Sequence, residues 1–329
     1  MFEATYVLPL KWADTSASAE MTEYLRRLAG WIDVIVVDGS PLEVFEHHAE
    51  RWTPMFKHIR PDPDLHFTNG KVDGVTTGIR AAGTEAVVIA DDDIRFDEAS
   101  LGRVVDLLRD HDLVFAQSYL DPTPWHAQWE EARILLNRAF GVQFPVAMGL
   151  RRSMFLRMGG YDGDVMFENL ELIRSMRFAG ARVAAPNDLF VRHLAPDRDW
   201  FWSQRVRQAF DDFTLPGRMA LWLSLGPLAM RSLAQGRRGR IAVGALGAVA
   251  VAEVGRRRGG GARVYPPTAP LFAPLWLGER AICSWVALWH RMRTGGIPYR
   301  GGVIERAATP RRKLRAQIEQ RLSRPDPEP

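Results

Sequence analysis

The stretch Ala-Val-Val-Ile-Ala-Asp-Asp-Asp, residues 86–93, joins an apolar strand to a cluster of three carboxylates. Small and β-branched residues in an unbroken run are typical of a strand that is covered on both faces. Adjacent negative charges repel one another unless a cation neutralises them, and Mg2+ or Mn2+ prefers oxygen ligands. Mg2+ takes one or two protein carboxylates and completes its shell with substrate phosphates. Asp91 and Asp93 are therefore candidate ligands for a metal-bound diphosphate. The alternative is an acidic loop that favours the start of the next helix through Asp97 and Glu98.

Strands and helices alternate around this stretch. The apolar spacing predicts a parallel sheet that is covered by helices on both faces. Ligands of such sheets bind at the carboxyl ends of the strands, where both Asp38 and the three aspartates would lie. The predicted strands are 5–10, 33–38, 56–59 and 86–90, and the predicted helices are 19–28, one that starts near 42, and 70–82.

Charge is distributed unevenly along the 329 residues, of which 47% are apolar. Residues 1–215 carry 23 Lys and Arg against 33 Asp and Glu, whereas residues 216–329 carry 20 against 6. A basic segment that also contains apolar tryptophan-rich runs favours lipid over nucleic acid as a partner. The single cysteine, Cys283, excludes an intramolecular disulfide. The first twenty residues lack the pattern of a signal peptide, so we expect the catalytic part to stay in the cytosol.

The character of the chain changes after residue 215. We predict a first domain over 1–215, a helical membrane-associated region over 216–310, and a disordered tail over 311–329. The apolar run 241–254 would form a helix of about 21 Å, shorter than the roughly 30 Å hydrocarbon core of a bilayer. With arginines on both sides of this run, a hairpin that enters one leaflet is favoured over a full crossing. The alternative is a small soluble helical subdomain or a dimer interface.

The order of several short motifs resembles that of the family 2 glycosyltransferases, which are inverting enzymes of the GT-A fold that use nucleotide-diphosphate sugars. The resemblance covers roughly residues 4–213, and its strength lies in order and spacing. The motifs are Val-Val-Asp-Gly-Ser at 36–40, Asn-Gly-Lys-Val-Asp-Gly at 69–74, Asp-Asp-Asp at 91–93, Met-Gly-Gly-Tyr-Asp at 158–162, Phe-Glu-Asn-Leu-Glu-Leu at 167–172 and Gln-Arg-Val-Arg-Gln at 204–208.

The resemblance implies a role for each of these positions. The metal ligands would be Asp91 and Asp93. Residues for binding the donor would be Pro9, Asp38, Lys71, Asp92, Gln204, Arg205 and Arg207, with Asp38 on the uracil. The last motif resembles the Q-x-x-R-W sequence of lipid-acting and polymer-forming members, such as ceramide glucosyltransferase.

Two positions depart from the family. Asn169 stands where the catalytic base aspartate is usual, and an amide does not accept a proton at neutral pH. Glu168 is then the expected base, with Glu171 and Asp164 as alternatives. Gln208 replaces the tryptophan of the last motif, which questions whether an acceptor stacks there.

The expected function is metal-dependent, inverting transfer of a sugar from a nucleotide-diphosphate sugar, a UDP-sugar, to a lipid or lipid-linked acceptor. The reaction would take place at the cytoplasmic face of the cell membrane, with Mg2+ or Mn2+ as cofactor. Two alternatives come from other classes: a non-catalytic nucleotide-sugar or lipid-binding relative, and a nucleotidyltransferase.

Overall fold

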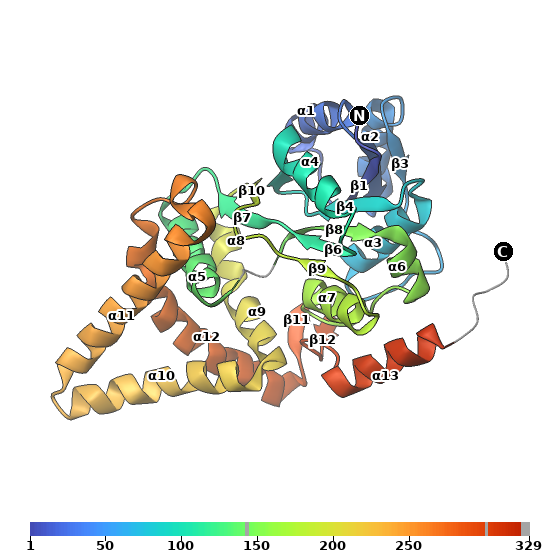
Figure 1. The fold of residues 1–329 in the computed structure, drawn as a ribbon. Helices are drawn as coiled ribbons and strands as arrows, with labels where there is room; N and C mark the ends of the chain where they lie inside the picture. The colour runs from blue at the N-terminus through green and yellow to red at the C-terminus, as the bar shows by residue number, and fades with distance from the viewer. Residues whose placement is uncertain (142–144, 300–301, 324–329) are drawn as a thin grey trace. The chain divides into compact units, whose positions relative to one another are not determined.

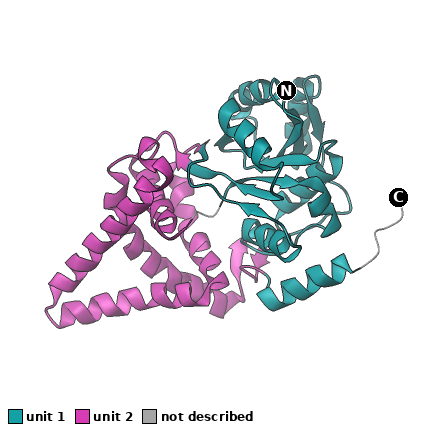
Figure 2. Ribbon diagram, in the orientation of Figure 1, with its two compact units in different colours: residues 1–118, 145–191, 309–329 teal, residues 119–144, 192–308 magenta. Residues whose placement is uncertain are grey.

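The computed structural model describes residues 1–141, 145–299 and 302–323. The chain divides into two compact units, coloured separately in Figure 2. Unit 1 comprises Met1–Ser118, Pro145–Val191 and Thr309–Pro329, and unit 2 comprises Tyr119–Phe144 and Arg192–Ala308. This division differs from the predicted boundaries at 215 and 310, because unit 2 takes an earlier segment and unit 1 takes the C-terminal one.

A seven-stranded sheet forms the centre of unit 1, in the order β3-β2-β1-β4-β8-β6-β9 (Figure 1). The pairs of β1 with β2 and β4, of β2 with β3 and of β6 with β9 are parallel, whereas β8 runs antiparallel to β4 and β6. The sheet is therefore mostly parallel, as predicted. Its strands are β1 (Ala4–Leu10), β2 (Asp33–Asp38), β3 (Lys57–Ile59), β4 (Ala86–Ala90), β6 (Leu113–Phe115), β8 (Ala147–Arg151) and β9 (Val183–Ala184).

Helices cover both faces of this sheet, and strand β4 shows why. Val88 and Ala90 belong to one hydrophobic cluster, whereas Val87 and Ile89 belong to the other, so alternate side chains of one strand serve two cores. The first cluster includes residues of α1 and α4, and the second includes residues of α3, α6 and α7. The helices of unit 1 are α1 (Ser18–Ala29), α2 (Leu42–Trp52), α3 (Gly70–Ala81), α4 (Glu98–Leu107), α6 (Arg152–Arg157), α7 (Glu168–Phe178) and α13 (Arg311–Leu322).

The parallel strands end at one edge of the sheet. Leu10, the last residue of β1, pairs with Asp38, the last residue of β2, and Asp91 directly follows β4. The predicted strands and helices up to residue 90 are therefore confirmed, with small shifts at their ends. A second sheet contains the short strands β5 (Ile94–Arg95), β10 (Phe190–His193) and β7 (Gln117–Leu120).

Helix α13 differs from the disorder that we predicted for residues 311–329. Leu314 and Ile318 are 3% and 0% exposed and belong to the second core cluster of unit 1. These side chains are one helical turn apart, so two apolar residues suffice to anchor a helix that is otherwise polar. The end of the predicted tail, 324–329, lies outside the described residues.

Unit 2 is mainly helical, and three long helices dominate it. Helix α11 spans 20 residues, about 30 Å, and is thus longer than the 14-residue apolar run from which we predicted it. Its additional turns consist mostly of arginine and glycine at both ends. The elements are α5 (Trp125–Phe140), α8 (Arg198–Ser203), α9 (Arg205–Phe210), η1 (Asp211–Thr214), α10 (Pro216–Ala234), α11 (Arg238–Arg257), η2 (Arg258–Arg263), η3 (Ala269–Phe272), α12 (Ala273–Thr294), β11 (Ile297–Tyr299) and β12 (Gly302–Ile304).

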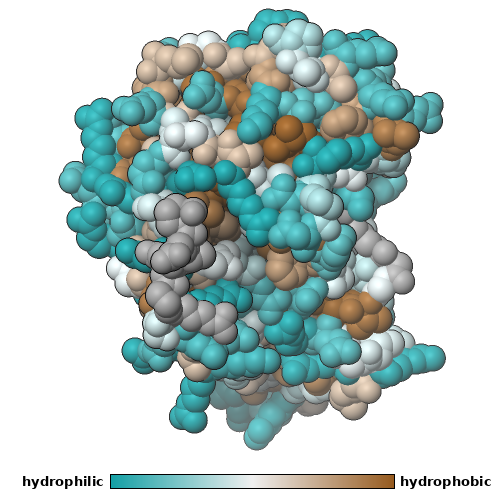
Figure 3. Space-filling view, turned by 90° about the vertical axis from the view of Figure 1, so that its right-hand side faces the viewer, coloured by the Kyte–Doolittle hydropathy of each residue, from teal (hydrophilic) through white to brown (hydrophobic). Residues whose placement is uncertain are grey.

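Apolar side chains are exposed along the long helices of unit 2. Val243 and Leu246 on α11 are both 70% exposed. Among the described residues one segment, Ala269–Thr294, is long and apolar enough to cross a membrane by length and composition, and 39% of its apolar window is buried within the protein. On the face of the molecule in Figure 3, by contrast, hydrophobic residues form small separate patches among hydrophilic ones.

Candidate active site

The carboxylates after β4 are held by the two loops that follow the neighbouring strands. Asp92 accepts a hydrogen bond from the indole Nε1 of Trp12, which lies just beyond β1. The backbone N–H of Trp12 donates to Ser40 Oγ beyond β2, over 2.8 Å. Burial raises the pKa of Asp92, although the Trp12 hydrogen bond opposes that shift. Three loops at the carboxyl edge of the sheet are thus tied together around Asp92.

Lys71 connects this edge to helix α7. Its ammonium nitrogen lies 2.5 Å from Asp91 Oδ1 and 2.7 Å from Glu168 Oε1, and it donates to Asn169 Oδ1 over 3.4 Å. Asn69 caps α3 by accepting a hydrogen bond from the backbone of Lys71, which fixes where the lysine leaves the helix. Residues from three separate motifs of the sequence, at 71, 91 and 168, therefore form one ion network.

The ion network carries more negative than positive charge. Burial raises the pKa of Asp91 most, the Lys71 ammonium lowers it, and Asp93 and Glu168 raise it further, to about 6. Burial acts to lower the pKa of Lys71, but Asp91 and Glu168 outweigh it and hold that pKa well above its usual value. Lys71 pairs with two carboxylates, and Asp93 adds further negative charge beside Asp91, so a divalent cation would be stabilised here. The oxygen donors of Asp91 and Asp93 fit Mg2+ or Mn2+.

The geometry separates the three carboxylates that we considered as the base. Glu168 lies in the first turn of α7 and points to Lys71. Glu171 is fully buried and accepts the backbone N–H of Thr309 over 3.0 Å. Asp164 accepts hydrogen bonds from the backbone and hydroxyl of Thr68, over 2.9 and 2.8 Å. Of the three, Glu168 is the one that the structure brings together with Asp91.

Asp38 is buried, and its predicted contact with the nucleobase stays a prediction. Its side chain is 0% exposed, Oδ2 lies 2.8 Å from His48 Nδ1 and 3.1 Å from His58 Nε2, and Oδ1 accepts the N–H of Ser40 over 2.9 Å. Burial acts to raise the pKa of Asp38, but these hydrogen bonds outweigh it and hold it well below its usual value. Asp38 therefore cross-links β2, α2 and β3 from within.

Asp38, His48 and His58 also form a group of the kind that binds metal ions. A metal on the ring nitrogens that face Asp38 would move each N–H to the opposite nitrogen. Among the described residues those opposite atoms, His48 Nε2 and His58 Nδ1, are buried without a hydrogen-bond partner. Ligating histidines normally donate through that second nitrogen. The arrangement therefore fits two histidines that each donate to one carboxylate. Burial also lowers the pKa of His48.

Pro9 lies near the carboxyl end of β1 and is half-buried. A Cβ on Gly74 of α3 would lie 2.8 Å from Pro9 Cβ, so the glycine allows α3 to approach the strand closely. Pro9 thus packs the helix that carries Lys71. Its predicted contact with the donor stays a prediction.

Gln204, Arg205 and Arg207 lie in unit 2. Arg205 is 4% exposed, its Nη1 lies 2.7 Å from Glu130 and 3.6 Å from Glu279, and it stacks on a phenylalanine ring. This guanidinium is bound in a buried ion pair, and its predicted contact with the donor stays a prediction. Gln204 donates to the hydroxyl of its neighbour Ser203, and Arg207 lies 5.8 Å from the ring of Tyr299.

Sequence reasoning missed Trp12, His48 and His58. Trp12 binds Asp92 and lies edge-on to His48, with ring centroids 5.5 Å apart. The histidines come from α2 and β3, and nothing in their local sequence indicates that they meet at Asp38.

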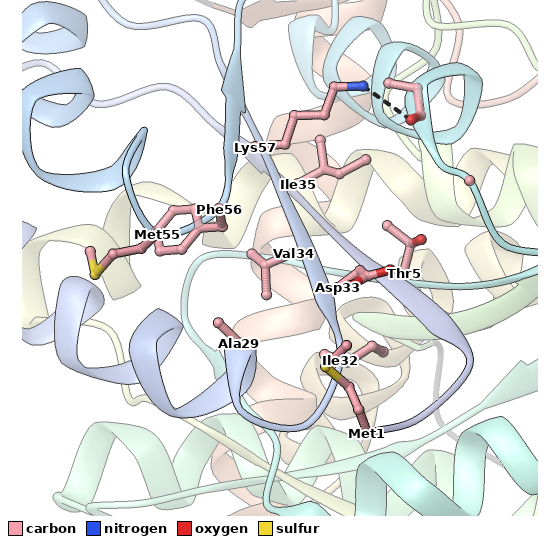
Figure 4. Close-up of a pocket in the computed structure, with 12 residues that line it drawn as sticks. Met1, Thr5, Ala29, Ile32, Asp33, Val34, Ile35, Met55, Phe56 and Lys57 are labelled. Carbon is pink, nitrogen blue, oxygen red and sulfur yellow. Dashed lines mark hydrogen bonds between the residues drawn. The ribbon is translucent and has the colours of Figure 1, made fainter.

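A separate pocket of about 360 Å³ lies at the opposite ends of the strands (Figure 4). Asp33 and Lys57, the first residues of β2 and β3, line it, together with Met1 and Thr5. Lys57 donates to the carbonyl of Ala81 over 3.2 Å. Ligands of parallel α/β sheets bind at the carboxyl ends of the strands, so the Lys71 network is the better candidate site.

Known proteins that are similar to this chain are sugar transferases. Residues 19–165 match the Glycosyl transferase family 2 model, and this segment contains Lys71 and the three aspartates. The mannosyltransferase PcManGT from Pyrobaculum calidifontis, solved with GDP-Man and Mn2+, is similar at a TM-score of 0.52 and 17% identity, over 86% of this chain and 87% of that chain. A glucosyl-3-phosphoglycerate synthase from Mycobacterium tuberculosis, solved with Mn2+, UDP and phosphoglyceric acid, is similar at a TM-score of 0.41 and 17% identity, over 63% of this chain and 76% of that chain. No curated protein matches the sequence. The α/β architecture is thus GT-A-like, and the comparisons support a glycosyltransferase whose residues 19–165 are similar to family 2.

Proposed function

We propose that the protein uses a divalent metal ion to transfer a sugar from a nucleotide-diphosphate sugar, a UDP-sugar, to a hydroxyl of a lipid or lipid-linked acceptor, with inversion. The observation that carries this proposal is the position of Lys71 Nζ between Asp91 and Glu168. Lys71 and Asp91, which we expect to bind the donor and its metal ion, therefore lie beside Glu168, the expected base. PcManGT, which shares the fold, was solved with GDP-Man and Mn2+.

The chemistry assigns a task to each residue of the network. In the transfer, the acceptor oxygen forms a bond to the anomeric carbon, the bond from that carbon to the diphosphate breaks, and the nucleoside diphosphate leaves. Glu168 accepts the proton of the acceptor hydroxyl. The acceptor oxygen attacks from the face opposite the leaving group, and this attack inverts the anomeric centre. Lys71 pairs with Glu168 and places positive charge beside the diphosphate. Asp91 and Asp93 would hold the metal ion, which stabilises negative charge on the leaving group when bound.

A panel of nucleotide sugars and nucleoside diphosphates tests the donor. Thermal unfolding is measured for the full chain with each compound, with Mn2+ or with EDTA. A ligand that binds the native state stabilises it by mass action, so a UDP compound should raise the melting temperature only when Mn2+ is present. A panel without any metal-dependent shift would contradict the proposal.

The proposed acceptor and membrane location are supported by unit 2. Leu228 and Met230 on α10 are 56% and 66% exposed, Leu246 on α11 is 70% exposed, and Trp285 and Trp289 on α12 are about half exposed. Exposed apolar side chains with tryptophan and arginine are typical of proteins that bind at a membrane surface. Arginines also stand in the turn and first residues between α10 and α11, at 237, 238 and 240. The proposed location is the cytoplasmic face of the cell membrane.

Sedimentation with anionic liposomes at low salt tests this location. The double substitution Val243→Ser and Leu246→Ser removes apolar surface from α11 and should reduce the bound fraction several-fold. Val303→Ser, at a residue of β12 that is 44% exposed, is the control outside the long helices and should bind like the unaltered protein. If the unaltered protein stays in the supernatant, unit 2 does not bind lipid and the acceptor must be sought among soluble compounds.

A further inference from the structure

The chain returns from unit 2 into unit 1 at Thr309, and residues 309–322 form what we call the C-terminal strap. We propose that this strap is a positioning element for the active site, because it holds both helix α7, which carries Glu168, and the turn that supports Lys71. The proposal rests on the function assigned to Glu168 above. Its steps are contacts within unit 1.

The first contact is with α7. The backbone N–H of Thr309 donates to Glu171 Oε2 over 3.0 Å, and Glu171 lies in the same first turn of α7 as Glu168. Further along, Leu314 and Ile318 share a hydrophobic cluster with Met176 of α7. The strap therefore binds α7 along its length, by a hydrogen bond at its start and by apolar packing farther on.

The second contact is with the turn at 158–162. Arg321 Nη1 donates to the carbonyl oxygens of Met158, Gly159 and Gly160, over 3.4, 3.2 and 3.2 Å. Both glycines have positive φ angles, +72° and +71°, a conformation that other residues rarely adopt. The Thr309 hydroxyl also donates to Asp162 Oδ2, over 3.4 Å. Thr309, at the start of the strap, thus binds Asp162 of the turn, and Arg321, near the end of the strap, binds the carbonyl oxygens of the turn.

The two residues that directly follow the turn, Gly163 and Asp164, support the start of helix α3. The carbonyl of Gly163 accepts the N–H of Asn69 over 3.0 Å, and Asp164 accepts the N–H of Thr68. A Cβ on Gly163 would lie 2.5 Å from Phe67 Cβ, so the two segments are in close contact. Asn69 is the residue that caps α3 at Lys71. The strap consequently reaches both partners of the ion pair, Glu168 directly through α7 and Lys71 through the turn.

Catalysis is sensitive to such support. A base that is displaced by about 1 Å from the acceptor loses as much as a hundredfold in rate. The strap, which comes from far along the chain, binds three backbone carbonyls and two carboxylates. A strap that served only to bury Leu314 and Ile318 would not require Arg321 or the Thr309 hydroxyl.

The test compares Arg321→Met with Arg315→Met in the 329-residue chain. Arg315 lies on the same helix, is 67% exposed and pairs with Glu319 on the surface, so it is the matched control. Loss of the Arg321 guanidinium should lower kcat about tenfold and change the KM for the donor by less than about twofold. Arg321→Lys should recover part of kcat. Thr309→Val, which removes one hydroxyl, should lower kcat by a smaller factor.

Hydrogen exchange gives a readout that is independent of catalysis. Amides of residues 167–171 and 69–72 should exchange faster in Arg321→Met than in Arg315→Met. If both kcat and exchange in Arg321→Met match the control, the positioning role is refuted. If the melting temperature falls but kcat per folded molecule does not, the strap only stabilises the fold and the proposal fails. If exchange changes as expected but the unaltered protein transfers no sugar, the strap still positions these segments and the proposed function is what fails.

Discussion

Each unit of the protein contains a cluster of charged side chains, and the two clusters differ in balance. In unit 2, Glu130 lies beside both Arg205 and Arg133, and burial, which acts to raise its pKa, is outweighed so that the pKa falls to about 2. In unit 1, Asp91 has Lys71 beside it, yet its pKa rises to about 6. The surroundings of Glu130 therefore stabilise its anion, whereas the surroundings of Asp91 favour its protonated form.

The number of positive groups explains the difference. In unit 2, the carboxylates of Glu130 and Glu279 are met by the guanidiniums of Arg133 and Arg205. In unit 1, Lys71 pairs with both Asp91 and Glu168, and the neighbouring Asp93 adds negative charge beside Asp91. A cluster that is almost fully buried and whose charges balance needs no further ion. A partly exposed cluster with excess negative charge is stabilised by a cation from solution. The first arrangement indicates structure and the second indicates a binding site.

Glu168→Gln should have the largest effect. The amide keeps the size of the side chain but cannot take a proton, so turnover should fall by roughly a hundred- to ten-thousandfold while donor binding is nearly unchanged. Steady-state kinetics and calorimetry measure the two quantities. Glu171→Gln and Asp164→Asn are the comparisons. A larger loss of turnover in either of them than in Glu168→Gln would move the base to that residue.

Arg205→Met should affect stability instead of chemistry. Removing one partner of a buried ion pair leaves Glu130 and Glu279 with less compensation, at a cost of about 3–5 kcal/mol in the free energy of unfolding. Urea unfolding measures this cost, and Arg198→Met, at a side chain that is 70% exposed in the same unit, is the control. If the unfolding free energy of Arg205→Met is normal and its affinity for the donor is lost, Arg205 contacts the donor instead.

Asp91→Asn should act in the opposite direction when metal is absent. The folded-state pKa of Asp91 lies above its usual value of 3.8, so the folded protein binds the proton more tightly than the unfolded chain. Its contribution to stability is present below about pH 4 and is lost as the pH rises through about 6. In EDTA at pH 7, the amide should therefore raise the free energy of unfolding by about 1–3 kcal/mol, and the gain should vanish near pH 4. A loss of stability at pH 7 would show that Asp91 is a structural partner of Lys71.

Trp12→Phe should have the smallest effect. It removes the indole N–H that binds Asp92 and keeps an aromatic ring beside His48. A single hydrogen bond to a charged group contributes about 1.5–3 kcal/mol, of which only the part that orients the loop affects the ligand. Affinity for a nucleoside diphosphate with Mn2+ should fall several-fold, with little change in melting temperature. An unchanged affinity would limit Trp12 to packing.

Much of unit 1 could be predicted because its signals are local. The apolar residues of β4 alternate between two cores, and the aspartates follow at the strand end, so strand and candidate site were evident from one stretch. The order of motifs named Lys71 for donor binding and Glu168 as the base, but nothing in the sequence predicted that the two would form an ion pair. Contacts between distant segments were missed, such as His58 with Asp38 and the burial of Ile318 in a polar helix, because neither leaves a local pattern.

The central claim is that the excess negative charge of unit 1 binds a metal ion together with a nucleoside diphosphate. Isothermal titration calorimetry of UDP measures this for the unaltered protein and for Asp93→Asn, each with Mn2+ and with EDTA. We expect binding to the unaltered protein with Mn2+, and a large loss of affinity both in EDTA and in Asp93→Asn, with unchanged melting of the metal-free protein as evidence of an intact fold. Equal affinity in all four titrations would contradict the claim.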